Sequence, residues 1–340
     1  MFSSVEKSAK SAGEAALFEQ SASGKKKLPR NNNNPVNNYN FDTIIIGIVL
    51  AATAVFYYGR RAFAILIVSV LCCVVLQVAV SLVTHKKVLS SIAPAFAVGL
   101  INAVILPVTV PFGAVAVSAA VSIILLRAAF GGNEHEVINP SAGALLFIFF
   151  AFPGKLNVFT NVFESLPVEI AVYPDSAVDS FFGSLINAGL TVGDYPELLA
   201  GRLPFIMGGC TLIIIAALIM YIIRRDISGI AFIFAAACFF GISYLVTDSL
   251  RAAIYALAGI LPGMVLTALP VSARFSGTSA KLIYGIALGL VCSLFIWYSK
   301  NEYGGFFAAV ILSPLSAYFA NHEWNLKKLL PSRLRKMKLS

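Results

Sequence analysis

Charged residues are scarce in this sequence, and their scarcity excludes an ordinary soluble domain. Only 12% of the 340 residues are charged, whereas 59% are hydrophobic, and soluble domains are about a quarter charged. The apolar residues come in long blocks, which is typical of transmembrane helices. The net charge of +9 therefore indicates basic cytoplasmic ends of a membrane protein rather than a nucleic-acid partner.

The sequence also lacks the residue patterns of several common chemistries. Its five cysteines all lie in apolar runs and none forms a C-x-x-C pattern, so we interpret them as small buried hydrophobic residues. Catalytic triads, P-loops and glycine-rich dinucleotide motifs are missing. Ionisable residues inside the apolar blocks are few and form no chain of buried carboxylates. We therefore predict no catalytic residue, no metal site and no self-sufficient ion pump.

The apolar blocks that are present predict an all-α polytopic membrane protein of about ten transmembrane helices. Several blocks are short or interrupted by Pro or Gly, so some helices are expected to be broken or half-spanning, which is tolerated where protein covers the backbone. The expected spans are 42–58, 62–84, 90–107, 110–129, 139–153, 203–223, 227–246, 250–269, 280–298 and 304–320.

The two halves of the chain echo each other. ILPVTVP (105–111) in the third span recurs as ALPVSAR (268–274) in the eighth. Because each half has five spans, an odd number, the second half is expected to be inverted relative to the first. Inverted repeats of this kind build sites near the middle of the membrane from interrupted helices.

Five regions follow from this layout, and their charges give the orientation. We predict a disordered cytoplasmic N-tail without a signal peptide (1–41), a first transmembrane repeat (42–153), an acidic extracytoplasmic loop (154–202), a second repeat (203–320) and a basic cytoplasmic C-tail (321–340). Lys and Arg gather in the two tails and in the connections on the same side, so both termini are placed in the cytoplasm. The predicted location is the inner, cytoplasmic membrane. In this layout Arg60 and Arg61 fall in an outer connection.

The segment GGNEHEVINPSAG (131–143) places polar residues just before the fifth span. Glu134, His135 and Glu136 are consecutive and rarely point at one metal, so a solvated loop is the simpler interpretation. Asn139 followed by Pro140 is typical of a helix start, with Asn as the N-cap. The alternative is a ligand site, because free N–H groups at a helix start favour a phosphate or the polar edge of a ring.

Three segments resemble one family of integral membrane proteins. RAAFGGNEHEVINPSAGALLFIFFAFP (127–153) is similar to the family's K-x-x-FGG-x-x-x-N-x-FNPA-x-x-G stretch. LPVSARFSGTSAKLIYGIALGLV (269–291) is similar to its DPV…G-x-LIYG-x-x-x-G segment, and EYGGFFAAVILSPLSAYFA (302–320) to its closing YPEG-x-x-FA-x-L-x-N helix. The family comprises the D-type membrane component of the Rnf electron-transport complex and the B-type component of the sodium-pumping NADH:quinone reductase. The resemblance covers most of 42–320.

This resemblance implies an electron-carrying subunit that holds flavin. Family members carry FMN linked to a threonine of the outer loop between the fifth and sixth spans, and often riboflavin or a second flavin in the core. The candidate cofactor-binding residues here are Gly131, Gly132 and Asn139 of the FGG…NP stretch, and Ser184, a hydroxyl near the expected attachment point. FMN or riboflavin is accordingly the expected cofactor.

The attachment motif of the family, S/T-G-A-T, is degenerate in this sequence. In the best register Gly183 stands at the acceptor threonine, and in a register shifted by two residues Leu185 does. Neither side chain carries a hydroxyl that could take the phosphate, and Ser184 lacks the motif around it. The sequence therefore predicts that flavin is not attached covalently.

Three functions are compatible with these observations. The first is a membrane subunit of an Rnf-type ion-translocating electron-transport complex, which is part of an oxidoreductase rather than a stand-alone enzyme. Its partners would be other membrane and peripheral subunits of the complex, together with the lipid bilayer. The second is a small-solute channel or transporter with a layout like that of urea channels. The third is a non-redox structural subunit of such a complex.

Overall fold

The computed structural model describes residues 35–85, 88–130, 138–152, 154–163, 195–202, 205–275 and 277–321. The chain divides into two units, 1–38 and Tyr39–Ser340, and the helices discussed below belong to the second unit, apart from the first residues of α2. All elements of the described residues are helices, so the predicted all-α class is confirmed. The predicted inversion of the second half relative to the first stays a prediction.

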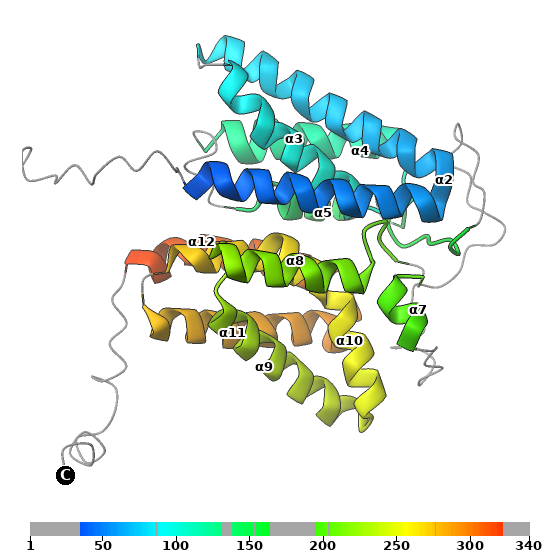
Figure 1. The fold of residues 1–340 in the computed structure, drawn as a ribbon, viewed down its shortest axis with the longest axis vertical. Coiled ribbons are helices and arrows are strands. Elements are labelled where there is room, and N and C mark those ends of the chain that lie inside the picture. The colour runs from blue at the N-terminus through cyan, green and yellow to red at the C-terminus, as the bar shows by residue number, and fades with distance from the viewer. Residues whose placement is uncertain are drawn as a thin grey trace, which may run out of the picture. The chain divides into compact units, whose positions relative to one another are not determined.

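The first half of the chain begins with α2, which consists of two helices joined by a sharp turn (Figure 1). α2 (Pro35–Val83) joins the two spans that the sequence predicted separately, and Gly59 marks their junction. Gly59 has a φ of 64° and a ψ of −142°, a non-helical conformation that glycine adopts at little cost, and the chain turns back there (Figure 1). The remaining helices of this half are α3 (Val88–Val104), α4 (Phe112–Ala120), the π-helical η1 (Val121–Ala128) and α5 (Pro140–Ala151).

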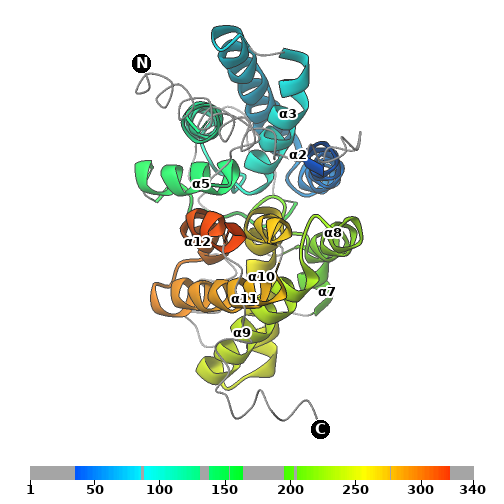
Figure 2. The ribbon, with the colours of Figure 1, turned by 90° about the vertical axis from the view of Figure 1, so that its left-hand side faces the viewer.

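The second half contains longer helices that change geometry along their length. After the short α7 (Tyr195–Ala200) come α8 (Thr211–Arg224) and α9 (Gly229–Thr247). The next helix runs as α10 (Leu250–Gly263), π-helical η2 (Met264–Ala268) and 3-10 helical η3 (Leu269–Arg274), and is followed by α11 (Thr278–Ser293) with η4 (Leu294–Tyr298) and by α12 (Gly304–Asn321). Figures 1 and 2 show α2–α5 gathered in one group and α8–α12 in another, with α5 next to α12 where the groups meet.

The helices are apolar enough for a multi-pass membrane protein. Four are long enough to cross a membrane: Tyr39–Val83, Gly229–Thr247, Leu250–Ala273 and Thr278–Tyr298. The shorter apolar helices are Val88–Val104, Phe112–Ala128, Pro140–Ala151, Thr211–Arg224 and Gly304–Pro314. Short helices of this kind agree with the expectation that some spans are broken or half-spanning.

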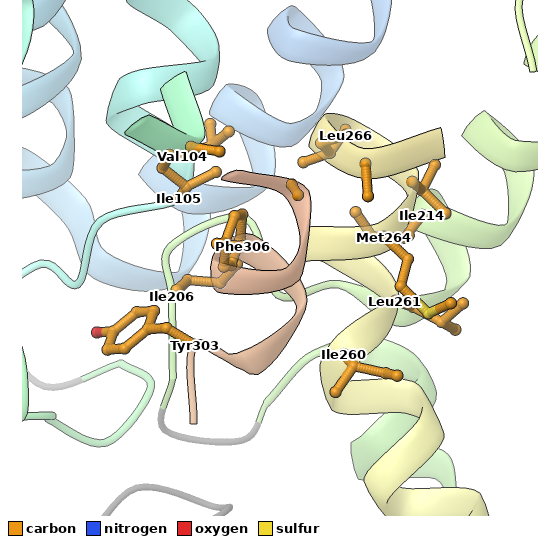
Figure 3. Packing of buried hydrophobic residues seen from close by; sticks show 14 of the residues in the cluster. Val104, Ile105, Ile206, Ile214, Ile260, Leu261, Met264, Leu266, Tyr303 and Phe306 are labelled. Atoms are coloured by element: carbon orange, nitrogen blue, oxygen red, sulfur yellow. The ribbon is translucent and has the colours of Figure 1, made fainter. Parts of the chain in front are cut away.

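The core lies where the ends of α3, α10 and α12 meet the stretch that precedes α8. Figure 3 shows aliphatic side chains from these elements packed around Phe306, with Tyr303 at one side. All of the labelled residues are buried, and they are Val104, Ile105, Ile206, Ile214, Ile260, Leu261, Met264, Leu266, Tyr303 and Phe306. The two halves of the sequence therefore share one hydrophobic core at the points where their helices are interrupted.

Candidate functional site

The first interruption lies between α3 and α4, in residues 105–111. It contains Pro107 and Pro111, and proline lacks the N–H that a continuing helix needs. Val108 and Val110 are nevertheless buried, so their free carbonyl groups are out of reach of water. Buried carbonyl groups without partners are costly, and inside a membrane the protein itself has to supply the donors.

Arg61 supplies those donors. Its Nε donates to the Val108 carbonyl oxygen at 2.7 Å, and its Nη2 donates to the carbonyls of Thr109 at 3.3 Å and Val110 at 3.2 Å. The side chain is only 2% exposed, and its guanidinium carbon lies 5.6 Å from the centre of the Phe112 ring. Arg61 lies two residues after the turn at Gly59, so it stands at the connection between the first two spans, as predicted, but its side chain is buried against the first interruption. The outer side of this connection stays a prediction.

Residues from the second half complete the same interruption. The Met207 N–H donates to the Leu106 carbonyl at 3.1 Å, and the Gly208 N–H donates to the Val104 carbonyl at 2.7 Å. Gly208 suits this approach, since a Cβ atom there would lie 2.9 Å from the Val104 Cβ. The end of α3 is thus capped by backbone from the stretch before α8.

The second interruption lies along α10, η2 and η3, where side chains satisfy the backbone. The hydroxyl of Tyr284 on α11 donates to the Ala268 carbonyl at 2.7 Å, and the Thr267 hydroxyl donates to the Gly263 carbonyl. At the η3 turn, the Ser228 N–H donates to the Ser272 hydroxyl at 3.0 Å. All the polar side chains involved are buried, so this region is held by specific hydrogen bonds rather than by water.

Asn139 links the start of α5 to this second interruption. Its Oδ1 accepts from the N–H groups of Ser141 at 3.1 Å and Ala142 at 3.2 Å, which confirms the predicted N-cap with Pro140 at the first helical position. Its Nδ2 donates to the Thr267 carbonyl at 3.2 Å, across to the other half of the chain. An amide nitrogen carries two N–H groups, and no described contact uses the second.

An apolar groove lies beside this cap. It has a volume of about 510 Å³ between η1, α5 and α12 and is lined by residues that include Ile138, Gly143, Phe147 and Val310. Its lining residues carry no charged group, so it suits an apolar chain such as a lipid tail better than a polar ring.

The other candidate residues fall outside this geometry. Gly131, Gly132 and Ser184 lie outside the described residues, as do Glu134, His135 and Glu136. Within the part of the chain that the structure describes, no three His, Cys, Asp or Glu side chains group as metal ligands, and the five cysteines are free. Two features went unnoticed in the sequence: Arg61 on the first interruption and Thr267 opposite Asn139.

We expect Asn139→Ala to lower the free energy of unfolding by about 1–2 kcal/mol, because it removes both the cap and the bond to the Thr267 carbonyl. Denaturant unfolding in detergent micelles measures the change. Asn139→Asp is the matched control, since its carboxylate still caps α5 but cannot donate to Thr267. An Asp variant as unstable as the Ala variant would show that the cap contributes little.

Comparison with known proteins finds a matching family and several distant relatives. A family model described as "NQR2, RnfD, RnfE family" matches residues 29–322. The D component of the ion-translocating oxidoreductase complex of Methanosarcina acetivorans is 24% identical over 296 residues, which cover 84% of this chain and 88% of that relative.

Two bacterial relatives are longer than this chain. The B component of the Na⁺-translocating NADH-quinone reductase of Pseudoalteromonas atlantica is 24% identical over 260 residues, covering 68% of this chain and 60% of the relative. The protein of the same name from Klebsiella pneumoniae is 25% identical over 236 residues, covering 65% and 57%. The chain thus matches less than two thirds of the length of these two relatives.

Proposed function

The chain belongs to the NQR2, RnfD, RnfE family, and from that membership we propose that it is an integral membrane subunit of an Rnf-type ion-translocating electron-transport complex. The match over residues 29–322 carries the proposal, because it spans every described helix. The relative from Methanosarcina acetivorans, named as the D component of an ion-translocating oxidoreductase complex, supports the choice of complex. Other membrane and peripheral subunits would be its partners.

We propose flavin, as FMN or riboflavin, as its electron carrier. When bound, a flavin exchanges one or two electrons, and the protein positions it and tunes its chemistry. Asn139 fits such a role through its second N–H, which is available to a ring carbonyl while its other polar groups hold α5 and Thr267. Gly131 and Gly132 would offer main-chain N–H groups, and Ser184 a hydroxyl. The apolar groove beside Asn139 would add packing but no hydrogen bonds.

The proposed contact between Asn139 and flavin can be tested by measuring bound flavin as well as stability. If the second N–H of Asn139 binds flavin, the purified Asn139→Ala and Asn139→Asp variants should both lose bound flavin, because both lack the amide donor. Flavin released by acid and measured by fluorescence gives the ratio of flavin to protein. Retention of flavin in both variants would remove Asn139 from the binding site and leave it as a helix cap.

We expect no covalent flavin on this chain, because neither Gly183 nor Leu185 carries a hydroxyl at the position of the acceptor threonine. On a denaturing gel the purified protein should show no flavin fluorescence, and its intact mass should match the unmodified sequence. An adduct of the mass of FMN would contradict this. Ser184→Ala is the control, since loss of such an adduct in that variant would place the bond on Ser184.

A further inference from the structure

Two acidic side chains that are far apart in the sequence meet where α2 begins and α8 ends. Asp42 lies in the third turn of α2, and its side chain is only 1% exposed. Asp226 lies in the turn between α8 and α9, which is fixed by the Asp226 N–H donating to the Tyr221 carbonyl at 2.9 Å. Tyr221 brings the two together, because its carbonyl holds the Asp226 N–H and its hydroxyl lies 3.1 Å from Oγ1 of Thr43, the residue after Asp42. The two carboxyl groups interact with each other there.

The hydroxyl groups around this pair are committed elsewhere. Thr43 Oγ1 donates to the Tyr39 carbonyl at 2.8 Å, so its single hydrogen is used. The Tyr221 hydroxyl, 3.1 Å from Thr43 Oγ1, must then be the donor in that bond. Within the described part of the chain, both oxygens of Asp42 and Oδ2 of Asp226 are accordingly buried without a hydrogen-bond donor.

Among the described residues, one cation lies near the pair, and it does not balance two negative charges. Arg224 Nε lies 3.8 Å from Asp42 Oδ2, and the Arg224 side chain is 56% exposed. A buried carboxylate without donors is unfavourable, and two touching carboxylates do not both stay ionised at low cost. No positive charge of the described residues is therefore placed between the oxygens of the pair.

We propose that Asp226 binds a proton there and donates it as a hydrogen bond to Asp42, so that the pair carries one negative charge facing Arg224. The proton ties the start of α2 to the α8–α9 turn. Within the described residues, the charged and titratable groups facing it are Asp42 and Tyr39 on α2 and Tyr221 and Arg224 on α8. No motif in the sequence predicts this site, because its two carboxyl groups come from opposite halves of the chain.

Burial and the contact with Asp42 raise the pKa of Asp226 from 3.8 to about 6, and Arg224 offsets part of the rise. Since the pKa in the folded protein is raised, the folded protein binds more protons than the unfolded chain between these two values. The protonated contact stabilises the fold below that window. Stability falls as the pH rises through it, and the contribution of the proton is lost above about pH 6.

The test is the melting temperature of the full chain in detergent micelles at about pH 5 and about pH 7.5, on either side of the Asp226 pKa. We expect the melting temperature of the unmodified protein to fall by several degrees between the two. In Asp226→Asn the amide donates permanently to Asp42, so the fall should disappear and the variant should stay at the stability of the low-pH form. Asp248→Asn, at an exposed acidic residue, should keep the full pH dependence.

Two results would overturn the proposal. One is an Asp226→Asn variant whose melting temperature still falls like that of the unmodified protein. The other is a rise in melting temperature at high pH that follows sodium chloride but not choline chloride and is lost in Asp226→Asn, which would make the ligand sodium rather than a proton. If Asp226→Asn does not fold, infrared spectra of the unmodified protein still decide, since a protonated carboxyl band must vanish between the two pH values.

Discussion

Arg61→Ala is expected to lower the free energy of unfolding by about 4 kcal/mol, the largest effect of any single substitution considered for this protein. The guanidinium is buried and donates to three consecutive carbonyls, of Val108, Thr109 and Val110. Without it these carbonyls are left in the core without their charged donor, and the stretch between α3 and α4 loses its anchor. Denaturant unfolding in micelles, followed by tryptophan fluorescence, measures the loss.

The neighbouring arginine provides the matched control. Arg60 is exposed, so Arg60→Ala should change stability by less than about 0.5 kcal/mol although it removes the same charge. Arg61→Lys should recover only part of the loss, because an ammonium group lacks the planar fork that reaches three carbonyls at once. Equal effects of Arg60→Ala and Arg61→Ala would show that the buried guanidinium does not hold the interruption.

Gly289→Ala and Gly285→Ala should each destabilise the packing of α9 against α11 by about 2–3 kcal/mol. A Cβ atom at Gly289 would lie 2.6 Å from the Ala235 carbonyl oxygen and 2.8 Å from the Cys238 Cβ, and one at Gly285 would meet the Ala231 carbonyl oxygen. Helices in membranes pack closely through such small residues, so the backbone of α9 has to move away. Thermal unfolding in micelles measures the change.

Gly241 on the same α9 helix gives the opposite expectation. A Cβ atom there has no neighbour within 4 Å, so Gly241→Ala should be neutral or stabilise the protein by up to about 1 kcal/mol through helix propensity. If Gly241→Ala and Gly289→Ala destabilise alike, the close approach of α9 and α11 is not what these glycines provide.

Local features of the fold could be predicted well from the sequence. Asn139 followed by Pro140 predicted a helix start, and the structure places the N-cap there. The lengths of the apolar blocks predicted helices, and all elements of the described residues are helices. The break near Gly59 was also visible, and the structure places a sharp turn between two helices there (Figure 1).

Contacts between distant parts of the chain could not be predicted in the same way. A signal for Arg61 did exist, because it shares the helical spacing of the buried residues Ile65, Ser69 and Cys73, whereas Arg60 does not. Nothing local pairs Asp42 with Asp226, or Asn139 with the Thr267 carbonyl, because these contacts depend on how the two halves pack. A sequence read segment by segment contains no information on such packing.

The proposed function is tested most directly by purifying the tagged chain from its native membranes under mild conditions and identifying what accompanies it. We expect the chain to co-purify with other membrane and peripheral subunits, and the preparation to show an absorption change of flavin when a reductant is added. A chain that purifies alone, shows no redox-active absorption and conducts small solutes when placed in liposomes would contradict the proposal and indicate a channel instead.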